Sequence, residues 1–173
     1  MYKVVKPIAT EYQNKPWRNL KMPIFSQTSI DMSKLNPFHL AIPVYNLEKC
    51  RQFYGEILNC KEGRSSDNWV DFNFYGHQLV IHKKAGEPAK QVLDANPVDG
   101  KNVPIPHFGV VLEWEDWQQL ADRLKSFNTT FIIEPYIRFK GEPGEQATLF
   151  FLDPDGNALE FKAFKDMDQL FAT

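Results

Sequence analysis

Side chains that hold transition metals are scarce in this sequence of 173 residues. There are four histidines: His39, His77, His82 and His107. The two cysteines, Cys50 and Cys60, have no Cys-x-x-Cys spacing, which argues against a cysteine-based zinc site and against a disulfide scaffold. A metal site in this chain must therefore combine imidazoles with carboxylates, a donor set that suits Fe(II), Mn, Co, Ni or Zn.

His39 and His107 open two similar segments that lie 68 positions apart. In each segment the histidine is followed by an apolar, a small and a β-branched residue. A helical stripe of apolar residues comes next in both places, and then three strand-like stretches. The sequence thus predicts an internal repeat of two βαβββ modules, which makes an α+β fold.

One further candidate ligand lies in the last predicted strand of each module. Because alternate residues of a strand point to opposite faces, His82 and Glu160 each face away from their apolar neighbours. If the modules pair about a pseudo-twofold axis, these residues converge with His39 and His107 on the concave side of the combined sheet. Two histidines and one carboxylate form a facial triad with positions open for substrate or dioxygen. We expect His77, which follows a glycine in a predicted turn, at the surface or beside such a site.

Charge and proline content separate an N-terminal segment from the rest. Residues 1–35 carry six basic and two acidic side chains, whereas the whole chain has a net charge of −2. We predict one domain over residues 37–164. The complete organisation is a basic N-terminal arm 1–36, a first module 37–84, a connecting loop 85–106, a second module 107–164 and a C-terminal tail 165–173.

Composition excludes several classes of partner. The small net charge and a pI of about 6.1 give no positive field for nucleic acid or an anionic membrane. No apolar run approaches the roughly 20 residues that span a bilayer, and the arm lacks the apolar core of a secretory signal. We therefore expect a cytoplasmic protein with no nucleic-acid or membrane partner, and mitochondrial targeting by the basic arm stays open.

Three segments resemble motifs of the vicinal oxygen chelate superfamily, which includes glyoxalase I, extradiol dioxygenases and bleomycin-resistance proteins. They are Pro37–Val44, Phe53–Leu58 and Phe151–Phe161, the last with Asp-Pro-Asp-Gly-Asn followed by Leu-Glu-Phe. The resemblance implies that the modules pair into one open, cup-shaped mixed β-sheet barrel with flanking helices. It also implies that His39, His107 and Glu160 are metal ligands. Glyoxalases use a further ligand from the last strand of the first module, for which His82 is the candidate.

The resemblance further implies that one divalent metal ion chelates two neighbouring oxygens of a small-molecule substrate. A ring-cleaving, extradiol-type dioxygenase fits a set of two histidines and one carboxylate directly, although Phe150 stands near the place where these enzymes carry a tyrosine. Fe(II) is favoured, and Ni, Zn, Mn and Co stay open. The alternative is a glyoxalase I-like lyase or isomerase with Glu160 as a catalytic base. A metal-free binding protein of the bleomycin-resistance type is the third interpretation.

Four polar side chains are candidate substrate contacts: Arg64, Gln78, Arg138 and Lys162. Lys162 lies two residues beyond Glu160 on the same predicted strand face, so it either binds a substrate anion or forms an ion pair there. A homodimer also stays open, because members of the superfamily often dimerise and the N-terminal arm could support a dimer.

Overall fold

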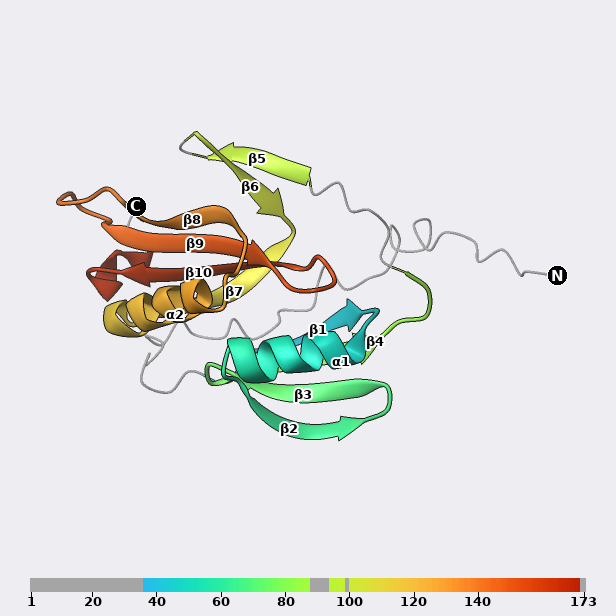
Figure 1. Cartoon of the computed structure of the whole chain (residues 1–173). Helices are drawn as coiled ribbons and strands as arrows, with labels where there is room; N and C mark the ends of the chain where they lie inside the picture. The colour runs from blue at the N-terminus through green and yellow to red at the C-terminus, as the bar shows by residue number, and fades with distance from the viewer. Residues whose placement is uncertain (1–35, 88–93, 99, 172–173) are drawn as a thin grey trace, which may run out of the picture. The chain divides into compact units, whose positions relative to one another are not determined.

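The computed structural model describes residues 36–87, 94–98 and 100–171, and internal contacts divide the chain into residues 1–36 and 37–173. The predicted N-terminal arm therefore lies almost entirely outside the described residues. From Pro37 onward, the prediction of an α+β fold built from two βαβββ modules is confirmed (Figure 1). Within the described part of the chain, no helix is long and apolar enough to cross a membrane.

The first module forms one four-stranded sheet, here called the first sheet. Its elements are β1 (His39–Val44), α1 (Leu47–Gln52), the π-helical turn η4 (Phe53–Ile57), β2 (Lys61–Ser66), β3 (Trp69–Phe74) and β4 (His77–Lys83). The strand order is β1-β4-β3-β2, with β1 parallel to β4 and the other pairs antiparallel. Helix α1 begins where the Asn46 side chain accepts a hydrogen bond from the backbone N–H of Lys49, 3.0 Å away.

The second module repeats this topology and forms the second sheet. Its elements are β7 (His107–Leu112), α2 (Trp114–Ser126), β8 (Phe131–Arg138), β9 (Gln146–Leu152) and β10 (Ala158–Phe164), followed by the 3-10 helix η5 (Met167–Phe171). The strand order is β7-β10-β9-β8, with β7 parallel to β10. The strands of the two modules form separate sheets in the described chain, and both sheets are open rather than closed into a barrel.

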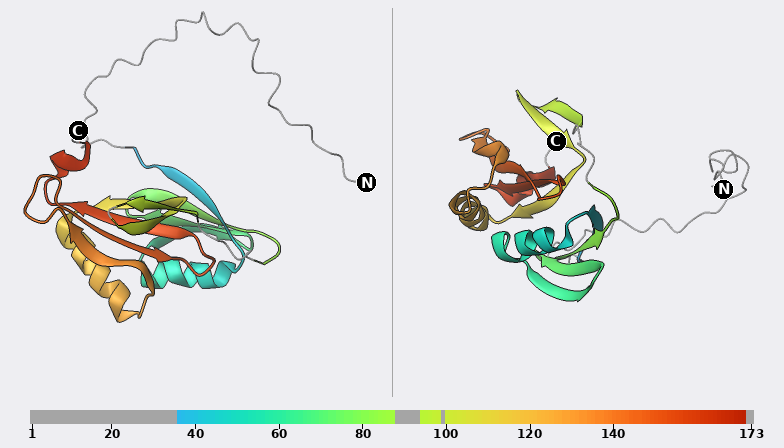
Figure 2. Two further views of the ribbon diagram at one scale, coloured as in Figure 1. Left: turned by 90° about the horizontal axis from the view of Figure 1, so that it is seen from above. Right: turned by 45° about the vertical axis from the view of Figure 1, so that its right-hand side comes forward.

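The segment that connects the modules contains two strands beyond the predicted elements. Strands β5 (Asp94–Val98) and β6 (Lys101–Ile105) pair as an antiparallel hairpin that projects from the start of β7 (Figures 1 and 2). The connecting loop predicted over 85–106 therefore includes two paired strands. Prolines within both strands obscure the two-residue period, whereas Asp99-Gly100 is a recognised hairpin signal.

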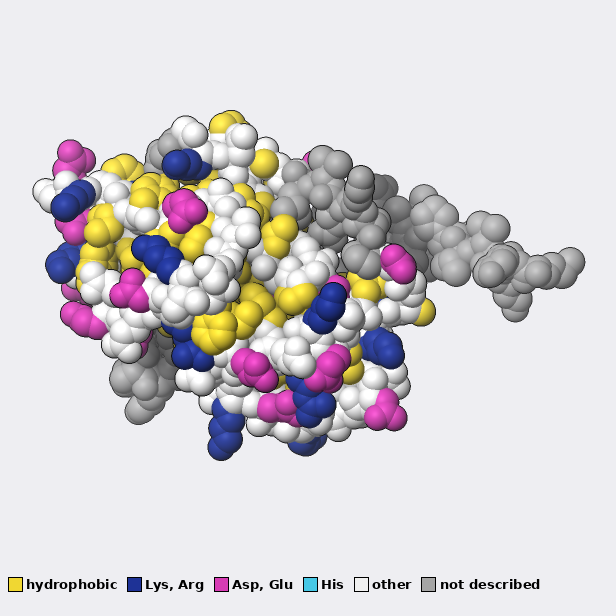
Figure 3. Space-filling model, in the orientation of Figure 1, with side chains coloured by type: hydrophobic (Ala, Val, Ile, Leu, Met, Phe, Trp, Pro, Cys, Tyr) yellow, Lys and Arg dark blue, Asp and Glu magenta, His cyan; other side chains and the backbone are white. Residues whose placement is uncertain are grey.

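One hydrophobic core joins the two modules. The Phe161 ring of β10 lies 5.7 Å from the Phe74 ring of β3 and stacks on Phe151 of β9 at 5.9 Å. Residues of both sheets and of α1 and α2 belong to the same buried cluster. Each sheet therefore has an open face, defined here as the face turned away from this core. No described histidine is visible on the side of the molecule shown in Figure 3, where α1 and α2 lie in front.

The Asp-Pro-Asp-Gly-Asn turn between β9 and β10 forms hydrogen bonds with the first module. The Asp155 carboxylate accepts hydrogen bonds from the backbone N–H groups of Tyr45 and Asn46 at the start of α1. The buried Asp153 carboxylate accepts one from the Tyr54 hydroxyl, 3.0 Å away. The motif that is most specific to the resemblance thus holds the two modules together.

Candidate functional site

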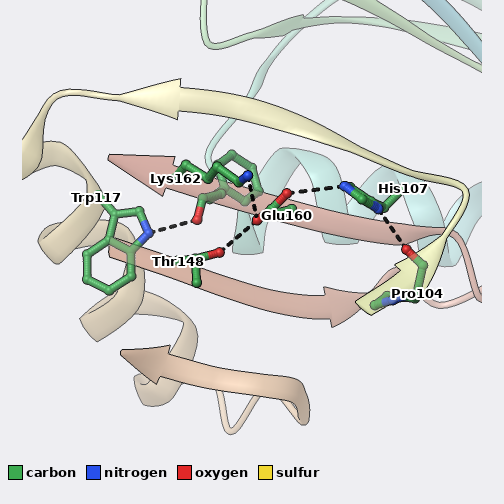
Figure 4. A network of polar contacts seen from close by, with 7 residues as sticks. Pro104, His107, Trp117, Thr148, Glu160 and Lys162 are labelled. Carbon is green, nitrogen blue, oxygen red and sulfur yellow. Dashed lines mark hydrogen bonds and ion pairs between the residues drawn. The ribbon is translucent and has the colours of Figure 1, made fainter. Parts of the chain in front are cut away.

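His107 and Glu160 meet on neighbouring parallel strands of the second sheet (Figure 4). Nε2 of His107 lies 3.2 Å from Oε2 of Glu160, a residue that is only 9% exposed. The register explains this closeness, because Gly109, two residues beyond His107 on the same face, pairs with Glu160. Gly109 has no room for a side chain, since a Cβ there would overlap the carbonyl oxygen of Glu160. Two of the predicted metal ligands are therefore brought together.

The second carboxylate oxygen of Glu160 is held by the protein. The Thr148 hydroxyl donates a hydrogen bond to Oε1 at 2.8 Å, and the Lys162 ammonium lies 3.3 Å from the same atom (Figure 4). Of the two roles predicted for Lys162, the structure therefore contains the ion pair with Glu160. Because Oε1 is engaged in this way, Oε2 is left directed at His107.

The orientation of the His107 ring follows from its other nitrogen. Nδ1 lies 2.7 Å from the carbonyl oxygen of Pro104, at the end of β6 (Figure 4). A carbonyl only accepts hydrogen bonds, so Nδ1 carries a proton and donates it. In the neutral ring, Nε2 then presents its lone pair toward Glu160. The hairpin between the modules thus orients a candidate ligand.

Tyr136 is a polar residue of this face that the sequence did not single out. It pairs in register with Thr148, and both burial and the negative charge of Glu160 raise the pKa of its phenol. Phe150 of β9 pairs directly with Glu160, whereas Tyr136 belongs to β8. Only the register of β8 against β9 could have revealed it, and that register contains two shifts.

His39 belongs to a second polar group, on the open face of the first sheet. Its Nδ1 lies 2.8 Å from Oε1 of Gln78, its register partner on β4. Nε2 of Gln78 lies 3.3 Å from Oδ2 of Asp71, and the Arg64 guanidinium lies 3.4 Å from the same oxygen. The sequence did not mark Asp71, because it is simply one polar position in an alternating strand.

Within the described residues, His39 is not part of one ligand cluster with His107 and Glu160. Among the residues that the structure describes, no group of three or more His, Cys, Asp or Glu side chains could hold a metal ion.

His77 accepts a hydrogen bond from the backbone N–H of Phe38 at 3.0 Å, next to the start of β1. Both cysteines are buried; burial raises the pKa of Cys50 far above its ordinary value and that of Cys60 to about 12, so neither is an activated nucleophile.

The register also separates His82 from the other candidates. His82 is exposed and lies four residues along β4 from Gln78, the partner of His39, which is roughly 13 Å of strand. Val80 follows Gln78 by two residues, just as Glu160 follows the register partner of His107 by two. Val80, and not His82, is therefore the residue of the first module that corresponds to Glu160.

The four predicted substrate contacts are divided between the two open faces. Arg64 and Gln78 lie on that of the first sheet, and Lys162 lies on that of the second. Arg138, at the end of β8, places its guanidinium 5.1 Å from the centre of the Phe139 ring. A substrate that touches all four must contact both faces.

Among the residues that the structure describes, His107 lines two cavities. One of about 380 Å³ is lined by His107, Glu160 and Lys162 and is bounded by Leu170 of η5. The other, of about 500 Å³, lies between β1 and β7, with largely apolar walls that include Leu40. Volumes of this size suit a small organic molecule.

Comparisons with known proteins identify the family that shares this architecture. The family model described as Glyoxalase/Bleomycin resistance protein/Dioxygenase superfamily matches residues 36–161. A glyoxalase/bleomycin resistance protein/dioxygenase from Alicyclobacillus acidocaldarius is 29% identical, with a TM-score of 0.65 over 79% of this chain and 96% of that one. An integron cassette protein from the Halifax Harbour sewage outfall is 27% identical, with a TM-score of 0.54 over 75% and 99%. The fosfomycin resistance protein of Listeria monocytogenes, 18% identical with a TM-score of 0.54 over 79% and 98%, shares the fold.

Proposed function

The chain belongs to the Glyoxalase/Bleomycin resistance protein/Dioxygenase superfamily, and we propose that it is a metal-dependent enzyme acting on a small molecule with two neighbouring oxygens. The observation that carries this proposal is the contact of half-buried His107 with buried Glu160 beside a cavity of about 380 Å³. Ionisable side chains that face each other in a cavity are typical of functional sites.

The chemistry of this pair fits a metal ion. Nδ1 of His107 donates to a carbonyl, so Nε2 of the neutral ring and Oε2 of Glu160 are two acceptors only 3.2 Å apart. Two acceptors at this distance require a cation between them, either a proton or a metal ion. An imidazole whose other nitrogen is anchored, next to a carboxylate whose other oxygen is anchored, is the usual surrounding of a metal ligand pair.

We propose His39 as the third ligand, supplied by a second copy of the chain. His39 lies on the open face of the other sheet, and the described residues of one chain form no cluster of three ligands. In a twofold dimer, His39 of the partner subunit would complete the pair formed by His107 and Glu160. His82 is left out of this set because of its distance along β4 from the register partner of His39.

Among reactions, we place ring cleavage by an extradiol-type dioxygenase with Fe(II) first. Val80 stands where a carboxylate of the first module would make a fourth ligand. A set of three ligands leaves positions open for substrate and dioxygen. The metal, when bound, supplies Lewis-acid stabilisation of charge on the substrate oxygens. The chain supplies the rest: Thr148 fixes Glu160, the Lys162 ammonium attracts a substrate anion, and Tyr136 presents a phenol on the same face.

The second candidate is a glyoxalase I-like lyase or isomerase in which Glu160 moves a proton. It is favoured by Phe150, which pairs with Glu160 and packs against the His107 ring at 5.2 Å. That position is where the resemblance leads one to expect a tyrosine in ring-cleaving enzymes. A proton-transfer reaction needs no such hydroxyl if the carboxylate itself is the base.

Metal analysis tests the common part of both candidates. The full chain, purified without added metal, should contain about one transition ion per chain, in line with tight ligand sets of this kind. Glu160→Gln should lose the ion, whereas Glu115→Gln, which changes an exposed carboxylate on α2, should keep it. A wild type that binds no transition ion would end the proposal. Oxygen uptake with ferrous iron and a panel of catechols, beside a hemithioacetal assay, then separates the two reactions.

A further inference from the structure

Asp71 is a buried carboxylate that the proposed reaction does not use. Its side chain lies on the open face of the first sheet, yet the residue is only 8% exposed. Burying a carboxylate is unfavourable unless its hydrogen bonds are well placed. The amide of Gln78 lies 3.3 Å and the guanidinium of Arg64 lies 3.4 Å from Oδ2 of Asp71. Because burying the Asp71 carboxylate is unfavourable, we expect its hydrogen bonds to have a function in the first sheet.

The contacts of Asp71 fix the orientation of the Gln78 amide. An ionised carboxylate only accepts hydrogen bonds, so the NH₂ group of Gln78 must face Asp71. The carbonyl oxygen of the same amide must then face the other way, where Nδ1 of His39 lies 2.8 Å from it. With the amide turned over, two acceptors would meet at Asp71, and the burial of that carboxylate would lack this hydrogen bond.

The orientation of Gln78 in turn decides which nitrogen of His39 carries the proton. Because Oε1 of Gln78 can only accept, Nδ1 of His39 donates, and Nε2 of the neutral ring keeps its lone pair. His107 reaches the same state by a different route, since its Nδ1 donates to the backbone carbonyl of Pro104. A backbone carbonyl cannot turn over, whereas a side-chain amide can, so only His39 needs a further group to hold its partner.

We propose that Asp71 is a positioning residue that acts through Gln78 to keep His39 in the tautomer able to bind a metal ion through Nε2. The three side chains come from neighbouring strands β3, β4 and β1, so the relay is part of the first sheet itself. This inference rests on the proposed function for its purpose, but its first step, the control of the tautomer, can be measured without any metal.

Asp71→Asn tests the relay with almost no change of shape. The substituted side chain can face Gln78 with either its oxygen or its NH₂ group, so the Gln78 amide is no longer held in one orientation. In the molecules in which Gln78 turns its NH₂ group to His39, Nδ1 of His39 must accept, and the proton moves to Nε2. We expect long-range ¹H–¹⁵N NMR of the metal-free full chain, at about pH 8 where imidazoles are neutral, to report this change for His39 and none for His107. Asp67→Asn, which changes an exposed carboxylate in the β2–β3 turn, is the matched control.

Metal affinity supplies the second readout. In a titration with Zn²⁺, Asp71→Asn should bind roughly 10–100-fold more weakly than wild type, the usual effect of losing an outer partner of a ligand. Gln78→Leu, which removes the acceptor for Nδ1, should weaken Zn²⁺ binding similarly and release the proton of His39 from Nδ1. This variant tests the link between Gln78 and His39 if Asp71→Asn does not fold.

The outcomes separate the relay from the proposed function. A His39 that keeps its proton on Nδ1 in Asp71→Asn and in Gln78→Leu overturns the relay, whatever the metal affinity. A wild type that does not bind Zn²⁺ removes the proposed metal site, while the NMR result still decides whether Asp71 controls the tautomer.

Discussion

The two modules present a histidine in the same way but surround it with different chemistry. In each module the first strand runs parallel to the last, and the histidine pairs with a residue of that last strand. The position two residues beyond this partner faces the same side as the histidine. This position is Val80 in the first module and Glu160 in the second. The repeat therefore preserves the geometry that displays an imidazole, while only the second module adds a carboxylate to it.

The surroundings differ as much as the ligands. Glu160 is 9% exposed and bonded to Thr148, so the second half of the site is held in place before any ligand arrives. His39 is exposed and held by the amide of Gln78. The second module therefore provides the buried part of the proposed centre, and the first module provides an exposed histidine.

The largest expected effect is on metal content, when His39 is replaced in one chain and Glu160 in the other chain of a dimer. His39→Gln and Glu160→Gln should each lose the metal ion when expressed alone. When the two variants are expressed together, a mixed dimer contains one site with His107 and Glu160 from one chain and His39 from the other. Metal content should rise from background to about half of the sites in mixed dimers, because one of two equivalent sites is complete in a twofold dimer.

Two controls make this complementation test decisive. His107→Gln mixed with Glu160→Gln should restore nothing, because both changes affect the same half of the centre. Failure of the first pair together with full metal binding by wild type would mean that one chain assembles its own site. Metal content of the separated mixed species, measured by mass spectrometry of the intact dimer, gives the answer.

The next effect concerns the small residue that follows each histidine by two positions. Ala41 and Gly109 occupy the same place in the repeat, facing Val80 and Glu160. A Cβ at Gly109 would overlap the carbonyl oxygen of Glu160, so Gly109→Ala must push β7 away from β10. Overpacking of this kind costs about 1–3 kcal/mol of unfolding free energy.

Ala41→Gly is the matched change in the first module. It should cost only about 0.5–1 kcal/mol, the usual penalty for glycine in a strand. Urea unfolding of both variants compares them directly. Similar losses for the two would mean that the strands of the second module can separate without strain, and that Gly109 does not set the distance between His107 and Glu160.

The repeat, the α+β class and the His107–Glu160 pair could be predicted because they depend on local period and on strand alternation. The relation of His82 to Glu160 could not, because it depends on the register of β4 against β1, and a shift of two residues keeps the same face. Asp71 and Tyr136 escaped for a similar reason. Their importance arises from neighbours on other strands, and a single sequence does not state which residues become neighbours.

The smallest effects should have opposite signs in the two modules. Hydrogen bonding to Arg51 lowers the pKa of Glu62 in the first module, whereas burial raises the pKa of Asp153 in the second. A lowered folded-state pKa adds stability that is present above the unfolded pKa and is lost as the pH falls through the folded one. A raised folded-state pKa adds stability that is present below the unfolded pKa and is lost as the pH rises.

Urea unfolding at about pH 4 and about pH 7 compares Glu62→Gln and Asp153→Asn with wild type. The advantage of wild type over Glu62→Gln should shrink on acidification, by less than about 1 kcal/mol because this ion pair is partly exposed. The advantage over Asp153→Asn should instead grow on acidification. If this advantage shrinks, the hydrogen bonds that Asp153 accepts from Tyr54 and Asn157 affect its pKa more than its burial does. The contact between the modules then depends on a charged carboxylate.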